Sequence, residues 1–354
     1  MPTESEAKKA IDKIIKKSRV HFYKPIQIAE ILYNHRTKRG YKLNDLESYR
    51  NISKRWRDEI SMLLVGRKST SSQKYQDNLF EPNAVPPELI AKLGAMNKKN
   101  NGSVEAYIYK SLEKRLSSVF EIEEHIRFAT PDNFSVKEVV GLFRANPGLK
   151  RSTDKIYEIL VYALFSTIVR ALRVQVSIEV GNVDKEILRD FDYFIKTVVG
   201  VEENKTRVVV PAALYRVGVT NAADRGLDMW SNFGAAIQVK HLTLKPEDVE
   251  GIAENITADR IVIVCLNSEK DAIEKLLQQV GWGDRIQGII TVDDLHNWYG
   301  LCLSKKYRSK LSGTLLKDVE REFFAEFPSS QEIKPFMKGR GYDKVALPNG
   351  WKVI

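Results

Sequence analysis

The chain has 354 residues, of which 43% are hydrophobic and 29% charged, with a formal net charge of +10, as in a globular protein of one large or two smaller domains. It contains no apolar run long enough to cross a bilayer and no apolar signal core at its N-terminus, so a cytoplasmic protein is expected. Its two cysteines, Cys265 and Cys302, lack metal-ligand spacing and favour reduced thiols over a disulfide framework or a zinc site.

The excess positive charge lies near the N-terminus. Residues 1–75 hold 18 Lys/Arg and 8 Asp/Glu, whereas the rest of the chain holds 38 of each. Such an excess is typical of a surface that meets a polyanion, with nucleic acid the leading candidate. A solvated basic helical surface would give the same count, so charge alone leaves both interpretations open.

The first half of the chain is expected to be helical, because apolar residues recur there at helical spacing. A polar segment at 67–87 interrupts this pattern and mixes hydroxyl, amide and basic side chains, which suits either phosphate and base-edge contacts or an ordinary surface loop. The candidate DNA contacts in it are Lys68, Ser71, Ser72, Lys74 and Gln76. The predicted helices cover residues 1–17, 24–36, 49–66, 86–97 and 103–127, with a linker at 98–103.

From about residue 150 the pattern changes to alternating helices and strands. The most apolar helix is expected at 152–173, followed by a helix at 184–198 and two more that flank a β-branched run typical of a buried central strand. The predicted later helices cover 245–256 and 269–281, and the predicted strands cover 174–180, 206–211, 226–230, 235–242, 259–266 and 285–291. This order predicts an α/β fold with a mixed central β-sheet flanked by helices and a helical N-terminal region.

These patterns divide the chain into three expected parts. Residues 1–148 form a mainly helical, basic DNA-binding region, and residues 149–300 form the catalytic α/β core. Residues 301–354 form a C-terminal helical extension.

Residues 224–241, DRGLDMWSNFGAAIQVKH, place an acid, an amide and an amine in two apolar strands around an Asn-Phe-Gly turn. If the strands pair, alternation puts Gln238 and Lys240 on one face and turns Val239 into the core. A lysine held on a rigid strand beside the carboxylate of Asp228 can help to bind a divalent ion and orient a water molecule. The same spacing also suits a surface ion pair between Asp228 and Lys240.

The spacing resembles the PD-(D/E)XK nuclease signature, in which an acid and a hairpin are followed by acid-x-Lys. Leu227 replaces the proline of that signature, and Gln238 replaces its second carboxylate. An amide oxygen still ligates a hard cation but adds no negative charge, so metal affinity falls. The resemblance assigns a further carboxylate to Glu158 on the preceding apolar helix, with Glu179 as second choice.

A wider resemblance covers most of the chain, from near residue 18 to beyond residue 290. The segments that carry it are SRVHFYKPIQIAEILYNHR, RNISKRWRDEI, STSSQKYQDNLFEPNAVPPEL, GLKRSTDKIYEILVYALF, VGVTNAADRGLDMWSNFGAAIQVKHLTL and ADRIVIVCL. Together they resemble the HaeII family of Type II restriction endonucleases, whose core is restriction-endonuclease-like. The resemblance implies Mg²⁺-dependent cleavage of double-stranded DNA at a short palindrome of the form purine-GCGC-pyrimidine, leaving 5′-phosphate and 3′-hydroxyl ends. It also implies a cognate DNA methyltransferase as functional partner.

In this interpretation each candidate catalytic residue has a defined role. Asp228 ligates Mg²⁺, and Gln238 contributes a neutral oxygen or holds a metal-bound water. Lys240 stabilises the negative charge that develops on the phosphate. Glu158 ligates the metal through water or supplies the second carboxylate.

A palindrome is most simply read by a two-fold homodimer, since each protomer then meets the same half-site. Asn221, Arg225 and His241 flank the hairpin and could read base edges in the major groove. Each has a structural alternative, namely a turn cap for Asn221, an ion pair with Asp224 for Arg225, and packing at a strand end for His241.

Two other functions stay open. A repair or mismatch-nicking nuclease of the same fold would act on damaged or mispaired DNA as a monomer. A DNA-binding protein with a catalytically degenerate nuclease fold is kept open by Gln238. The sequence lacks a glycine-rich phosphate loop, which argues against ATP-driven restriction.

Overall fold

The computed structural model describes residues 2–38, 40–181, 184–202, 204–217, 227–240, 258, 260–279, 286–327 and 331–354. The chain forms two compact units, one built mainly from Met1–Tyr157 and Val319–Ile354 and the other from Glu158–Val217 and Asp224–Asp318. Within the described ranges, no helix combines the length and the apolar character that a bilayer span demands.

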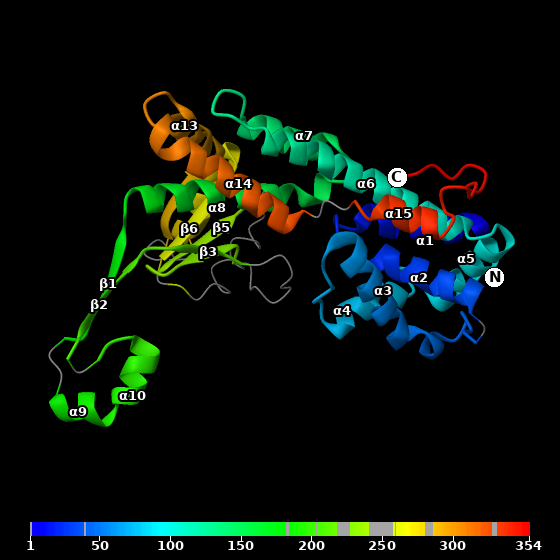
Figure 1. Cartoon of the computed structure of the whole chain (residues 1–354), viewed down its shortest axis with the longest axis horizontal. Helices are drawn as coiled ribbons and strands as arrows, with labels where there is room; N and C mark the ends of the chain where they lie inside the picture. Colours follow the sequence, from blue (N-terminus) through cyan, green and yellow to red (C-terminus); the bar gives the residue numbers. More distant parts are fainter. Residues whose placement is uncertain are drawn as a thin grey trace. The chain divides into compact units, whose positions relative to one another are not determined.

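The first unit is helical (Figure 1), and each helix predicted from periodicity in it is present. The N-terminal helix shows why: Thr3 and Glu6 form a capping box at its start, and its apolar stripe, which includes Ile11 and Ile15, is buried. Two further elements, α4 and α7, are not among the predicted helices. The helices of this unit are α1 (Glu4–Lys17), α2 (Tyr23–Thr37), α3 (Arg50–Val65), α4 (Gln73–Asp77), α5 (Pro87–Lys99), α6 (Ser103–Arg127), α7 (Val136–Ala145) and α15 (Ile333–Gly339).

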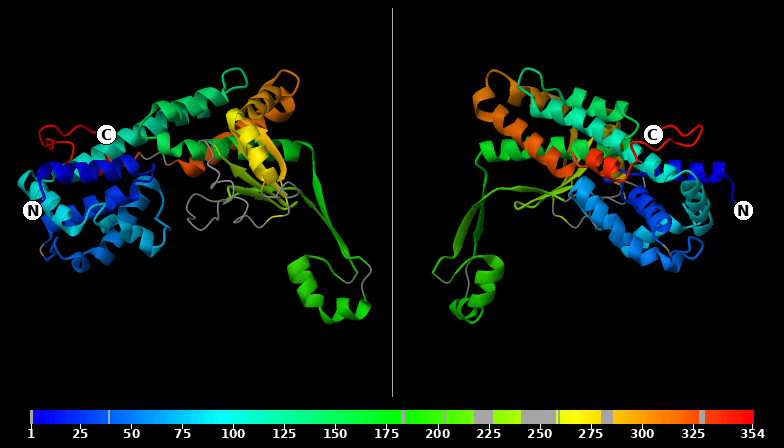
Figure 2. Two further views of the ribbon diagram at one scale, coloured as in Figure 1. Left: turned by 180° about the vertical axis from the view of Figure 1, so that it is seen from behind. Right: turned by 45° about the vertical axis from the view of Figure 1, so that its right-hand side comes forward.

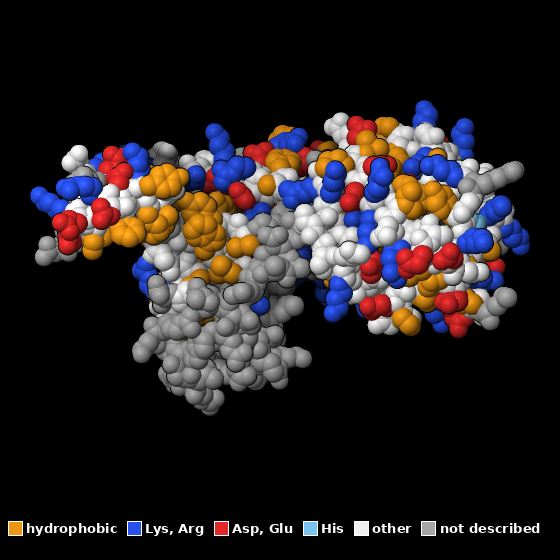
Figure 3. All heavy atoms as spheres, turned by 90° about the horizontal axis from the view of Figure 1, so that it is seen from below, with side chains coloured by type: hydrophobic (Ala, Val, Ile, Leu, Met, Phe, Trp, Pro, Cys, Tyr) orange, Lys and Arg blue, Asp and Glu red, His pale blue; other side chains and the backbone are white. Residues whose placement is uncertain are grey.

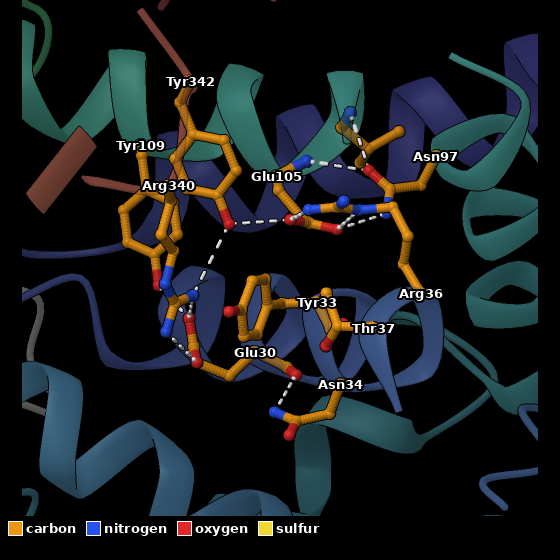
Figure 4. Close-up of polar contacts among 11 residues, drawn as sticks. Glu30, Tyr33, Asn34, Arg36, Thr37, Asn97, Glu105, Tyr109, Arg340 and Tyr342 are labelled. Atoms are coloured by element: carbon orange, nitrogen blue, oxygen red, sulfur yellow. Dashed lines mark hydrogen bonds and ion pairs between the residues drawn. The ribbon is translucent and has the colours of Figure 1, made fainter. Parts of the chain in front are cut away.

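A buried polar network joins the C-terminal segment to the N-terminal helices (Figure 4). Arg340 donates to both carboxylate oxygens of Glu30 in α2, and Tyr109 in α6 donates to the same carboxylate. A second carboxylate, Glu105, accepts two bonds from Arg36 at 3.0 and 2.8 Å and one from Tyr342 at 2.7 Å. Both carboxylates are buried, so their charges depend on these arginine partners.

His21, just before α2, gives the first unit a predicted dependence of stability on pH. Its ring is 8% exposed, and burial, with help from Arg67 and Arg19, lowers its pKa from 6.5 to about 4. Between pH 6.5 and 4 the imidazole of His21 is therefore protonated in the unfolded chain but neutral in the folded chain. The free energy of unfolding consequently falls as the pH drops through this window. The loss attributable to His21 should be on the order of 2–3 kcal/mol.

The measurement is the free energy of unfolding as a function of pH for the wild-type chain and His21→Gln. The variant should lose less stability than the wild type between pH 6.5 and 4, because glutamine does not titrate. Parallel curves for the two proteins across this window would contradict the assignment.

The second unit contains a five-stranded sheet with the order β3-β4-β5-β6-β7. The first three strands are antiparallel and the last three parallel, which makes the sheet mixed, as predicted. The helix α12 (Lys270–Gln279) lies between β6 and β7 in the sequence. The strands are β3 (Leu214–Arg216), β4 (Met229–Ser231), β5 (Ala235–Val239), β6 (Arg260–Cys265) and β7 (Ile286–Thr291).

Three helices contribute to this unit beside the sheet, namely α13 (Val292–Leu303), α8 (Thr153–Ala171) from Glu158 onward, and α14 (Gly313–Glu326) as far as Asp318 (Figure 1). Tyr299 of α13 donates to the carbonyl of Leu160 in α8 at 2.8 Å. Asp318 of α14 accepts from Thr167 at 3.2 Å and from Arg170, both in α8. These contacts fix the helix that carries Glu158.

The strands predicted at 174–180 and 206–211 are present as β1 (Gln175–Glu179) and β2 (Arg207–Pro211), but they pair only with each other. They form a separate antiparallel ribbon, and α9 (Lys185–Asp190) and α10 (Asp192–Phe194) lie at its far end. Figures 1 and 2 show this arm leading away from the five-stranded sheet. Both predicted strands are therefore present, and in the described part of the chain they form a ribbon of their own beside the five-stranded sheet.

Two further expectations can be compared with the described residues, and a third falls outside them. The α/β class is confirmed, and both cysteines are buried free thiols. Burial raises the pKa of Cys265 to about 11, so this thiol stays protonated at neutral pH. The helix predicted at 245–256 lies outside the described residues.

Candidate active site

The candidate site is built on the β4–β5 hairpin of the second unit. The turn between the strands is closed by Ser231, whose hydroxyl accepts from the N–H of Ala235 at 2.8 Å. Gly234 has φ +90°, a conformation that favours glycine, and so explains the Asn-Phe-Gly sequence of the turn. The strands pair with Met229 opposite Ile237, and continuing this register places Asp228 opposite Gln238.

The structure brings Asp228 and Gln238 into direct contact. The side-chain amide of Gln238 donates to Oδ2 of Asp228 at 2.7 Å, and the backbone N–H of Val239 donates to the same oxygen at 2.8 Å. These two bonds fix both the carboxylate and the orientation of the amide. The backbone of Asp228 is held as well, because its carbonyl accepts from Val217 at 2.9 Å.

The amide oxygen of Gln238 is the feature that points to a ligand. Gln238 is 2% exposed, and its buried Oε1 atom has no hydrogen-bond partner among the residues that the structure describes. A buried acceptor without a hydrogen bond lowers the stability of a protein by about 1–3 kcal/mol, so such acceptors are unusual in protein cores. Because the amide nitrogen is committed to Asp228, the oxygen is the end of the side chain left to bind a cation or a water molecule.

Lys240 follows β5 directly and is half-buried. Its N–H donates to the carbonyl of Val264 at 2.7 Å, which extends the parallel pairing of β5 with β6 to this residue. Strand alternation then places Lys240 on the same side of the strand as Gln238. Among the described residues, Oδ2 of Asp228 accepts from Gln238 and Val239, and no salt bridge joins Asp228 to Lys240.

The two candidate glutamates lie in different surroundings. Glu158 in α8 is 4% exposed and belongs to the same unit as the hairpin. Glu179 is exposed on the separate ribbon, with Arg207 opposite it in register. Both glutamates belong to the unit that carries Asp228 and Gln238, and of the two Glu158 is the buried one.

The residues present fit a hard divalent cation. A carboxylate and an amide oxygen are oxygen ligands of the kind that Mg²⁺ accepts, and Mg²⁺ usually keeps several waters and uses substrate phosphates. Among the described residues, no group of three or more His, Cys, Asp or Glu side chains could hold a metal ion. Asp228 and the free oxygen of Gln238 are therefore the set around which such an ion would be completed by water and phosphate.

The five candidate DNA contacts of the first unit lie in and beside α4. Ser72 caps this helix by accepting from the N–H of Tyr75 at 3.3 Å, and Gln76 donates to the carbonyl of Ser71 at 2.7 Å. The polar segment 67–87 thus contains a short capped α-helix, Gln73–Asp77, over part of its length, and the side chains of Lys68 and Lys74 are exposed to solvent.

The base-reading candidates Asn221, Arg225 and His241 lie outside the described residues. Part of the N-terminal positive charge is already paired within the unit. Arg36 bonds Glu105 at 2.8 Å, Lys54 bonds Asp77 at 3.0 Å and Arg57 bonds Asp58 at 2.7 Å. A count of N-terminal charges therefore overstates the positive charge that this unit offers to a polyanion.

An aromatic pair beside Asp228 is absent from the sequence-based candidates. Tyr215 of β3 stacks on Trp230 of β4 with ring centroids 4.3 Å apart, and both side chains are more than two-fifths exposed. Trp230 lies in a strand that the sequence predicts, so one member of the pair could have been identified. Its partner Tyr215 lies in β3, a strand that the sequence patterns did not predict.

Comparison with known proteins gives a consistent result. The family model described as HaeII restriction endonuclease matches residues 7–342. The chain is 48% identical over 340 residues to "Type II restriction enzyme HaeII" of Haemophilus aegyptius, covering 96% of this chain and 97% of the relative. It is 49% identical over 343 residues to "Type II restriction enzyme NgoBI" of Neisseria gonorrhoeae, with the same coverage of both chains. No solved structure gives a significant match.

Proposed function

The chain belongs to the HaeII restriction endonuclease family, and from this premise we propose that it cleaves double-stranded DNA at a short palindrome in a reaction that requires Mg²⁺. The observation that carries the proposal is the contact of Gln238 with Asp228, because it leaves the buried amide oxygen of Gln238 without a hydrogen-bond partner in the described part of the chain. Oxygen ligands on two paired strands are what a phosphodiesterase needs to hold a divalent ion.

In this proposal each side chain has a task that follows from its placement. Asp228 is held by two hydrogen bonds and would bind the cation, and Oε1 of Gln238 would add a neutral ligand or hold a bound water. Bound Mg²⁺ would polarise the scissile phosphate and lower the pKa of the attacking water. Lys240 would donate to the phosphate oxygens as their negative charge grows, and Glu158 would supply the additional carboxylate.

We further propose a site of the form purine-GCGC-pyrimidine, products with 5′-phosphate and 3′-hydroxyl ends, a two-fold dimer on the DNA, and a methyltransferase that protects the same site. The support is likeness to the family together with the argument that two identical protomers read a palindrome most simply.

The test is digestion of an unmethylated plasmid with Mg²⁺, followed by sequencing of the fragment ends. A discrete set of fragments that all end at one palindrome is the expected result. Random nicking would instead support a repair nuclease of the same fold. DNA binding without cleavage in Mg²⁺, Mn²⁺, Co²⁺ or Ni²⁺ would support a degenerate DNA-binding protein.

Gln238→Glu tests the role of the amide in the protein without DNA. The substitution removes the donor that bonds Asp228 and places two carboxylates in contact in a buried site. Like charges at this distance repel, so the variant should melt at a lower temperature than the wild type in EDTA. The corresponding loss in the free energy of unfolding should be about 1–3 kcal/mol. Added Mg²⁺ or Mn²⁺ should restore more stability to the variant than to the wild type, because it neutralises the pair.

The measurement is the melting temperature of both proteins across a titration of each ion. Equal responses of variant and wild type to both ions would contradict a cation bound between these two side chains.

A further inference from the structure

The arm formed by residues 174–211 carries a concentration of exposed apolar side chains. Eight of the 18 large hydrophobic residues that are exposed in the described part of the chain lie in it. At the left of Figure 3, hydrophobic side chains gather on the surface of the second unit, to which the arm belongs. The eight are Val174, Ile178, Ile187, Phe191, Tyr193, Phe194, Val198 and Val209.

The ribbon of the arm has one apolar face. The register pairs Val176 with Val210 and Ile178 with Val208, so these four β-branched side chains share one side of the ribbon. None of the four is buried, and Ile178 is 40% exposed. An isolated two-stranded ribbon is marginally stable in water unless its apolar face is covered.

The far end of the arm repeats this pattern. Phe191, Tyr193, Phe194 and Val198 lie in or beside α10 and the helical turn that follows it, and they are 57%, 82%, 55% and 66% exposed. Monomers rarely leave so many aromatic and β-branched side chains together in solvent. Aromatic residues are the type enriched at the centres of protein–protein interfaces.

The charge of the arm decides what covers it. Residues 174–211 contain five Lys/Arg and seven Asp/Glu, so the arm is slightly acidic in a chain whose net charge is +10. A DNA-contacting arm would carry excess positive charge to neutralise phosphates, and this one does not. A protein surface is therefore the occupant that fits.

We propose that residues 174–211 form the dimerisation arm of this protein, and that its apolar face is covered by the second copy of the chain. In a two-fold dimer each contact is formed twice, so the apolar face of the arm can lie against a different surface of the partner in a reciprocal pair of contacts. The slight acidity of the arm also suits a partner that is basic overall, as this chain is. This inference rests on the two-fold dimer of the proposed function and adds the surface that forms it.

The test is the mass of the full-length, DNA-free protein in solution, measured by sedimentation across a concentration series. The variants are Phe194→Asp in α10 and Ile178→Asp on the apolar face of the ribbon. Phe128→Asp is the matched control, since Phe128 is 69% exposed in the first unit. Melting curves of all variants check that the chain still folds, which the exposure of the substituted residues favours.

The wild type should sediment as a dimer, and each arm variant should raise the dimer dissociation constant by about 100-fold or more, whereas Phe128→Asp should leave it unchanged. A wild-type dimer that resists both arm substitutions would overturn the arm inference and leave the proposed dimer standing. A wild type that stays monomeric at every concentration without DNA would also overturn the arm inference, while a dimer that assembles only on DNA would remain.

Discussion

Asp228→Ala and Lys240→Ala should each lower the single-turnover rate of DNA cleavage by about 10³-fold or more, with little change in the affinity for specific DNA. Asp228 is the acidic member of the hairpin site, and its removal also frees the amide of Gln238 and the N–H of Val239 from their acceptor. Lys240 is the cation that strand alternation places beside them. Removing either group takes away charge that stabilises the transition state rather than contacts that select the DNA sequence.

The measurement is the rate of strand cleavage with enzyme in excess over a duplex that carries the recognition site, paired with binding of the same duplex in Ca²⁺. Asp271→Asn and Lys275→Ala are matched controls, because both residues are exposed on α12 in the same unit. The controls should cleave at the wild-type rate. Cleavage by either hairpin variant within about 10-fold of wild type would rule that residue out as catalytic.

Arg340→Met should destabilise the first unit by about 3–5 kcal/mol, because it leaves the carboxylate of Glu30 buried without its counter-charge. Arg340 donates to both oxygens of Glu30, and its guanidinium also lies 3.7 Å from the ring centre of Tyr33. The double variant Glu30→Gln with Arg340→Met should recover much of the loss, because no unpaired buried charge remains.

Urea unfolding of the full-length variants measures this effect. Glu47→Ala is the control, since Glu47 pairs with Arg50 at 3.0 Å on the surface of the same unit and should change stability by less than about 1 kcal/mol. A single variant no less stable than the control, or a double variant no more stable than Arg340→Met, would contradict the account of the network.

The candidate site could be predicted from the sequence because its elements are local. The Asn-Phe-Gly turn and the alternation around it identify β4 and β5, and their pairing brings Asp228 opposite Gln238. The hydrogen bond between the two side chains could not be foreseen, because the direction of an amide depends on its neighbours. The structure thereby adds the observation that Oε1 of Gln238 is the free end. The family resemblance is confirmed, since the family model matches residues 7–342.

Contacts between distant parts of the chain lay beyond prediction. Alternation identified β1 and β2 as strands but carries no information on their partner, so the separate ribbon was missed. The pair of Glu30 with Arg340 joins residues 310 positions apart, and no local pattern marks it. For the same reason, the N-terminal charge count did not distinguish arginines committed to buried carboxylates, such as Arg36, from lysines in solvent.

A divalent ion bound at Asp228 and Gln238 can be located directly by affinity cleavage of the polypeptide. Fe²⁺ can replace Mg²⁺ at such sites, and with ascorbate and peroxide it generates radicals that cut the polypeptide next to the bound ion. If the ion binds there, the wild-type chain should be cut close to residues 228 and 238. Excess Mg²⁺ should suppress these cuts, and they should be lost in Asp228→Ala. Cuts confined to other segments, or unchanged by that substitution, would show that the metal is bound elsewhere.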